Sequence, residues 1–136
     1  MLLLAPEVVR FDSFVWEDVV SIAIDRTAKH VVEEFSDAGP FATMVDVPEQ
    51  SIAVRVQRRI TGDDVDGPAL GAAGELVCYI GPGAAAIGRR RVSIACVLTG
   101  VRSELPSGKD ATRTLTFLCA SDGATDPISI TPAPDV

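Results

Sequence analysis

The residues of this chain that could carry out a reaction are few and lie far apart in the sequence. The only histidine, His30, follows Lys29 on the polar side of a predicted strand. No serine, cysteine or aspartate can be placed beside it from the sequence, so it lacks the partner that general-base or nucleophilic catalysis requires. A surface histidine is the simpler interpretation. We therefore expect that the chain is not an enzyme and that it binds no cofactor.

Two glycine-containing segments match phosphate-binding loops only in part. The segment 81–88, GPGAAAIG, lacks the Lys-Ser/Thr pair of a phosphate loop and the glycine spacing of a dinucleotide-binding turn. The segment Ser107-Gly108-Lys109 has a Gly-Lys pair, but it has neither the upstream glycine nor a following helix. The sequence favours plain loops in both places and predicts no nucleotide site.

Three carboxylates gather at Asp63, Asp64 and Asp66, directly before Gly67. A calcium loop of this kind also needs a bidentate glutamate at its last position. No glutamate stands at the required distance, so the segment does not predict a calcium site.

The three cysteines, Cys78, Cys96 and Cys119, all fall within predicted strands. Their number is odd and none of them forms a Cys-x-x-Cys pair, which argues against a disulfide framework and against a zinc site. We expect buried free thiols and a reducing compartment.

Charge is distributed unevenly along the chain. The net charge is −7, and residues 1–54 hold ten acidic residues against three basic ones, whereas the remainder holds nine of each. An acidic chain lacks the cationic surface that a nucleic-acid reader needs, although a surface past which DNA slides without adhering can be acidic. The one dense basic run is Arg89, Arg90 and Arg91. It could neutralise acids on an adjacent subunit, or it could be the solvated end of a strand.

The length and the apolar pattern predict a single all-β domain spanning residues 1–136. The chain is 47% hydrophobic but only 5% aromatic, so its core must consist of small aliphatic side chains, and assembly with other subunits would complete their burial. The first residues lack the basic lead of a signal peptide, and no segment is long and apolar enough to span a membrane. We expect synthesis in a cytoplasm.

Alternating and β-branched segments predict the strands of this domain. Asp46-Val47-Pro48-Glu49 could begin one or two turns of helix. The predicted fold class is therefore a β-sandwich or barrel of about six to eight antiparallel strands with at most one short helix. The predicted strands are Trp16–Arg26, Ala28–Phe35, Ser51–Ile60, Glu75–Ile80, Val92–Val101, Thr112–Ala120 and a last short one at 128–130.

The order of these parts resembles the tail tube proteins of tailed bacteriophages and of related contractile or phage-derived particles. The likeness lies in the strand VPEQSIAVRVQRRI (Val47–Ile60), the long loop after it (Gly62–Gly74), and the closing hairpin RVSIACVLTGVRSEL…ATRTLTFLCASDG with DPISI. It covers most of the chain, and it rests on size, strand order and composition because tube proteins carry no signature motif.

This resemblance implies a structural subunit made in the host cytoplasm and located in the virion tail. Subunits would form hexameric rings, and the stacked rings would form a hollow conduit through which DNA passes without specific binding. Sheath, baseplate or terminator proteins would be further partners. The candidate channel-lining acids are Asp25, Glu33 and Glu34, and the candidate inter-subunit contacts are Asp63, Asp64, Asp66, Arg89, Arg90 and Arg91.

A second interpretation is another virion β-domain, such as a tail terminator, a baseplate protein or a capsid decoration or binding module. A sugar-binding face usually displays exposed Trp or Tyr, and this chain has one of each. The sequence therefore leans toward the tube, and self-association is the property that separates the two interpretations.

Overall fold

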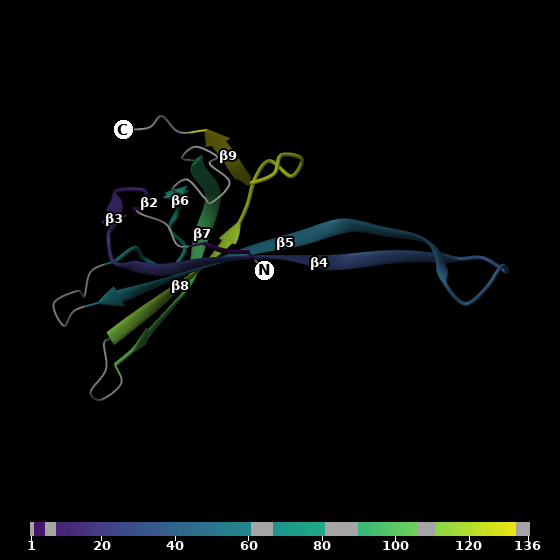
Figure 1. Cartoon of the computed structure of the whole chain (residues 1–136), viewed down its shortest axis with the longest axis horizontal. Helices are drawn as coiled ribbons and strands as arrows, with labels where there is room; N and C mark the ends of the chain where they lie inside the picture. Colours follow the sequence, from purple (N-terminus) through teal and green to yellow (C-terminus); the bar gives the residue numbers. More distant parts are fainter. Residues whose placement is uncertain (1, 5–7, 61–66, 81–89, 106–110, 133–136) are drawn as a thin grey trace.

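The computed structural model describes residues 2–4, 8–60, 67–80, 90–105 and 111–132. Within these ranges the chain forms nine strands and no helix, and every strand pairing is antiparallel, so the predicted all-β class is confirmed (Figure 1). No helix that could cross a membrane occurs among these residues. The strands are β1 (Leu2–Leu4), β2 (Val9–Phe11), β3 (Phe14–Trp16), β4 (Val19–Phe35), β5 (Ala42–Ile60), β6 (Ala73–Ile80), β7 (Arg90–Glu104), β8 (Ala111–Cys119) and β9 (Ile128–Pro132).

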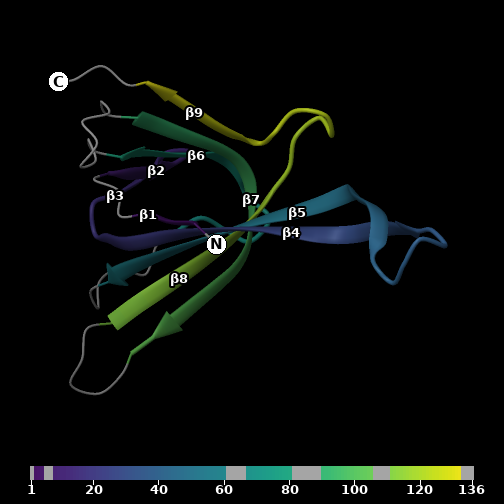
Figure 2. The ribbon, with the colours of Figure 1, turned by 45° about the vertical axis from the view of Figure 1, so that its right-hand side comes forward.

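One open sheet connects all the strands in the order β1-β4-β5-β8-β7-β6-β2-β3, and β9 also pairs with β7. The first half of β7 pairs with β6 and β9, and its second half pairs with β8. Because β7 curves strongly between these partners, the sheet folds over on itself into two layers (Figure 2). One layer contains β1, β4, β5, β8 and the second half of β7. The other contains β9, the first half of β7, β6, β2 and β3.

The core lies between the two layers and consists mainly of aliphatic side chains. Phe11 of β2 meets Phe117 of β8 with ring centroids 4.9 Å apart, so the two layers are in direct contact. Apolar side chains alternate with exposed ones along the central strands, as in a sheet that is buried on one face. The fully buried members include Val9, Ile22, Val54, Val56, Leu76, Cys78, Ile94, Leu98 and Leu115.

Strands β4 and β5 continue far beyond the layers as a two-stranded arm, which extends to the right in Figure 1. The sequence had predicted two separate strands at Trp16–Arg26 and Ala28–Phe35. This prediction is wrong, since β4 runs without a break from Val19 to Phe35.

The predicted helical turn at Asp46-Val47-Pro48-Glu49 is also wrong, because these residues belong to β5. His30 lies opposite Glu49 and Val32 lies opposite Asp46, so β5 contains one extra residue at Val47-Pro48. A β-bulge leaves a residue out of the hydrogen-bond ladder, and it therefore accepts a proline, which has no amide hydrogen to donate.

A buried arginine fastens the start of β4 to the end of β5. Arg58 donates from Nε and Nη2 to the two carboxylate oxygens of Asp18, each at 3.1 Å, and its guanidinium lies 5.4 Å from the ring centroid of Trp16. The Arg58 side chain is only 8% exposed. A charge this deeply buried depends on its carboxylate partner.

We predict that Asp18→Asn lowers the free energy of unfolding by about 1–3 kcal/mol, because the buried Arg58 loses its charged acceptor. Asp25→Asn is the matched control. It removes an exposed ion pair with Arg55, and it should cost less than about 1 kcal/mol. Urea denaturation of both variants measures the difference. Equal losses of unfolding free energy would show that the burial of Arg58 does not make its ion pair more stabilising than an exposed one.

Candidate assembly surface

The arm formed by residues 29–49 has no other part of the described chain packed against it. Within β4 and β5 it begins after the pair Ala28–Gln50, and its strands are joined by the turn at residues 36–41. All its side chains are exposed except the half-buried Val32 and Ala42. The Ser, Asp, Gly and Pro residues of this segment favour a turn. Nothing in the sequence pattern indicates that the flanking strands lie outside the core.

Several large apolar side chains of the arm face solvent. Phe41, at the turn, is 83% exposed, and Val45 is 61% exposed. Val31, Phe35, Met44 and Val47 are also exposed. Where exposed apolar side chains form a patch, they usually mark an interaction site.

β-Bulges decide which arm residues share a face. One extra β4 residue, Lys29, lies between the pairs Ala28–Gln50 and His30–Glu49, and it reverses the alternation of side chains beyond it. Asp25 and Glu34 are therefore on the same face of the strand, and Glu33 is on the other.

The two faces of the arm differ in composition. Glu33 lies directly opposite Val45, and alternation along β4 places Val31 and Phe35 on the same face as Glu33. We call these four residues, Val31, Glu33, Phe35 and Val45, the apolar arm face. The opposite face carries three acidic side chains, with Glu49 opposite His30, Asp46 opposite Val32 and Glu34 opposite Met44.

The predicted channel-lining acids lie in two separate parts of the molecule. Glu33 and Glu34 are exposed on the arm, whereas Asp25 is half-buried on the layer and accepts a hydrogen bond from Arg55 Nη2 at 3.3 Å. The structure does not bring these acids together into one acidic wall. Asp25 also differs from Ile22 and Ile24, which point into the core.

The outward side of the first layer is instead rich in threonine and arginine. Arg55 lies opposite Thr116 and Arg59 lies opposite Thr112. We call this surface the Thr–Arg face. Two of its arginines are paired with acids, Arg55 with Asp25 at 3.3 Å and Arg102 with Glu104 at 3.1 Å. Its members are Asp25, Arg55, Gln57, Arg59, Arg102, Glu104, Thr112, Thr114 and Thr116.

The predicted inter-subunit contacts are only partly within the described residues. Arg90 and Arg91 open β7, and Arg91 Nη2 lies 3.3 Å from Glu75 Oε1, which also accepts a hydrogen bond from Ser93. Arg91 thus has an acidic partner in its own chain. Asp63, Asp64, Asp66 and Arg89 lie outside the described residues, as do the segments 81–88 and 107–109.

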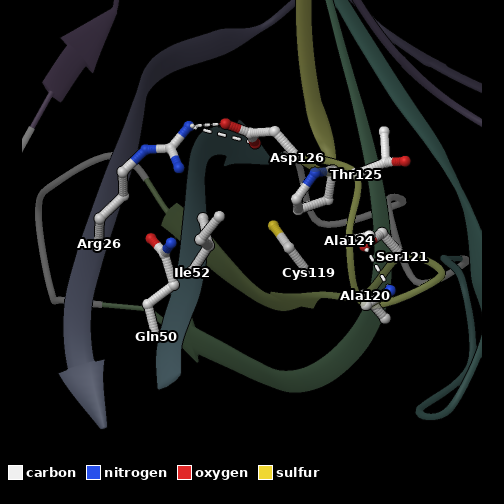
Figure 3. A pocket seen from close by; sticks show the side chains of 11 residues that line it. Arg26, Gln50, Ile52, Cys119, Ala120, Ser121, Ala124, Thr125 and Asp126 are labelled. Carbon is white, nitrogen blue, oxygen red and sulfur yellow. Dashed lines mark hydrogen bonds and ion pairs between the residues drawn. The ribbon is translucent and has the colours of Figure 1, made fainter. Parts of the chain in front are cut away.

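A pocket of about 340 Å³ opens at the base of the arm, where the β8–β9 connection passes over β4 and β5 (Figure 3). Arg26 Nη2 reaches across it to Asp126 Oδ2 at 3.1 Å. Ile52 and Cys119 form part of its wall, and the sulfur of Cys119 points into the space between the strands and the connection. The sequence contained no signal for this pocket, because its walls come from three separate segments.

The pocket loop is held by its own aspartates. Asp122 Oδ1 accepts hydrogen bonds from the backbone N–H groups of Thr125 at 2.8 Å and Ala124 at 3.0 Å, and these bonds lower the pKa of Asp122. Asp126 Oδ1 accepts from the Ile128 N–H at 2.9 Å. That bond, with a smaller contribution from Arg26, lowers the pKa of Asp126.

None of the described residues forms a recognisable reactive centre. No group of three or more His, Cys, Asp or Glu side chains in these ranges is placed to hold a metal ion. His30 is exposed on the arm. Burial raises the pKa of Cys78 and Cys119 to about 11 and that of Cys96 to about 12, so at neutral pH all three are protonated and weakly nucleophilic.

We predict that the carboxyl groups of Asp122 and Asp126 titrate below the ordinary aspartate value of 3.8. A lowered pKa in the folded state contributes stability above pH 3.8, and this contribution is lost as the pH falls through the folded value. An NMR titration of the side-chain carboxyl carbons measures both midpoints. In Arg26→Gln the Asp126 midpoint should stay below 3.8, because the Ile128 amide is the main cause. A midpoint at or above 3.8 in the unmodified chain contradicts the loop geometry.

No protein-family model matches this chain, and no curated protein matches it. Its function is therefore inferred below from its own sequence and geometry.

Proposed function

We propose that this chain is a structural subunit of a phage-type tail tube, in which hexameric rings stack into a hollow conduit for DNA delivery. The observation that carries the proposal is the exposed arm at residues 29–49. Two-stranded hairpins are at best marginally stable in water without further packing. An arm that also exposes Phe41 and Val45 gains its stability when another subunit covers it.

Self-association also accounts for the apolar side chains that lie outside the two layers. The apolar arm face continues beyond the buried side chains, and no described segment of the same chain covers it. A second copy can supply the missing apolar surface, since each copy carries both an arm and a body. When the arm of one copy packs on a different surface of the next copy, the contact runs head to tail and generates a ring if it closes or a filament if it does not.

In this proposal the Thr–Arg face lines the channel. Duplex DNA adheres to unpaired arginine through its phosphates. Asp25 and Glu104 hold Arg55 and Arg102 in ion pairs on this face, which reduces that attraction. DNA would then pass a nearly neutral, threonine-rich wall without specific binding. Glu33 and Glu34, on the arm, would belong to contacts between subunits or rings. Sheath, baseplate or terminator proteins are the further partners, and the virion tail is the location.

The alternative is another virion β-domain, such as a terminator, baseplate or decoration protein. The separation of Asp25 from Glu33 and Glu34 favours it, because the acids do not form the continuous acidic lining that the resemblance implies. A decoration or baseplate protein would use the same arm to clamp a different protein, and it would remain monomeric by itself.

We predict that the purified chain forms rings or tubes in a concentration-dependent manner and that Val45→Ser abolishes them. The serine removes an apolar contact from the apolar arm face without disturbing the core. Val15→Ser is the matched control, because Val15 is the same residue type, is 57% exposed and lies in β3, outside the arm.

Light scattering across a concentration series and negative-stain electron microscopy report the assembly. Circular dichroism confirms that both variants keep their β structure. A monomeric wild-type chain at high concentration would support the alternative virion role, and equal loss of assembly in both variants would remove the arm from the interface.

We predict that Asp25→Lys tubes retain duplex DNA at about 50 mM salt, whereas wild-type tubes release it. The substitution leaves Arg55 without its carboxylate and adds a second cation on the Thr–Arg face. Glu17→Lys makes the same charge change at an exposed residue outside both the arm and the Thr–Arg face, and DNA retention should not change. Co-sedimentation of labelled DNA with tubes of normal length measures retention. Release of DNA by the Asp25→Lys tubes would exclude the Thr–Arg face as the channel wall.

A further inference from the structure

The structure places two cysteines of adjacent strands directly opposite each other. Cys96 of β7 is the register partner of Cys119 of β8, and both thiols are free. Cys96 is buried in the core and Cys119 packs against the same cluster, so the two side chains lie on the same side of the sheet. Sequence alone did not pair them, because 22 residues separate them along the chain.

The hydrogen bonds around this pair identify its geometry. Ala120 donates its backbone N–H to the carbonyl of Ala95 at 3.2 Å, so Ala95 directs its backbone polar groups toward β8. Leu98 exchanges backbone hydrogen bonds with Gly71 and Ala72, on the other edge of β7. Because these directions alternate along a strand, Cys96 also points its backbone groups away from β8. Cys96 and Cys119 are therefore a non-hydrogen-bonded pair.

Non-hydrogen-bonded positions bring opposing residues closest together in an antiparallel sheet. Their Cα atoms are about 4.5 Å apart, which lies within the range of about 4.4–6.8 Å that disulfides span. We propose that Cys96 and Cys119 form an intramolecular disulfide when the protein meets a low-molecular-weight disulfide. The third thiol, Cys78, takes no part. It opposes Val92 of β7 and Val9 of β2, so no cysteine lies across from it.

The pocket supplies the route for the oxidant. Cys119 is half-buried and lines the pocket at the base of the arm, whereas Cys96 is sealed in the core (Figure 3). The Cys119 thiol loses its proton to solvent, and its sulfur attacks one sulfur of the small disulfide. A mixed disulfide forms and one small thiolate leaves. The Cys96 thiol then loses its proton, and its sulfur attacks the Cys119 sulfur, releasing the second small thiolate. Two protein thiols are oxidised, and one small disulfide is reduced to two thiols.

The bond would join β7 to β8 close to the curve of β7. It would form slowly at neutral pH, because burial raises the pKa of both thiols and thiolate is the reacting species. A reducing cytoplasm would keep both cysteines as free thiols, and an oxidising exterior would favour the disulfide. This inference is independent of whether the chain assembles into tubes.

Incubation of the folded 136-residue chain with oxidised glutathione at pH 8.5 tests the proposal. We expect the protein to lose two of its three thiols and about 2 Da of mass without gaining glutathione. After alkylation of the remaining thiol, trypsin should release the peptides 92–102 and 114–136 as one disulfide-linked species, because cleavage at Arg91, Arg102 and Arg113 separates the two cysteines. The thermal midpoint should rise by about 5–10 °C.

Cys78→Ala is the matched control and should form the same linked peptides, whereas Cys119→Ala should keep both remaining thiols. The wild-type peptide map decides the outcome even if a variant folds poorly. Three surviving thiols, a stable glutathione adduct on Cys119 alone, or only intermolecular bonds would overturn the proposal.

Discussion

The curve of β7 is the constraint on which the rest of the structure depends. A single open sheet with one apolar face cannot bury that face unless it folds over, and among the described strands β7 alone belongs to both resulting layers. Its partner on one edge changes near Ala95, from Pro127 at the start of β9 to Ala120 at the end of β8. The extra residue near Thr99 then allows the second half to follow β8. The contact of Phe11 with Phe117 exists because of this curve.

The same folding of the sheet explains why no second layer packs against the arm. Strands β6, β2 and β3 are short, so the second layer covers β4 and β5 only as far as Ile24 and Ile52. Beyond that point β4 and β5 continue for many residues without a second layer. Their mutual hydrogen bonds fix the backbone, but they bury little apolar surface. The arm therefore depends on its surroundings for stability, whereas the two layers have a core of their own.

The sequence predicted the fold class and the positions of the regular strands, because alternation at Ser51–Ile60 and at Val92–Val101 reflects true one-sided burial. The prediction failed where apolar residues that fit the strand pattern are exposed in the structure. Val31, Phe35 and Val45 look like core residues in the sequence, and only the short second layer leaves them exposed. Strands β1, β2 and β3 have three residues each, too few for a period to appear. Pro48 was interpreted as a helix start because a bulge and a cap both tolerate a missing amide hydrogen.

Candidate site residues were harder to predict than strands, since a site depends on long-range register. Asp25 and Glu33 would share a face of β4 if its side chains alternated without interruption, but the extra residue Lys29 places them on opposite faces. Composition indicated an acidic N-terminal third, yet the structure gives Asp25 an arginine from the balanced remainder of the chain. Net charge along the sequence therefore does not determine the charge of a face. The ion-pair partner of each charged side chain does, such as Arg55 for Asp25 and Glu104 for Arg102, and these pairs make the Thr–Arg face nearly neutral although the whole chain is acidic. A surface of paired charges attracts phosphate weakly and repels it weakly, which is the electrostatic property that the proposed DNA conduit would require.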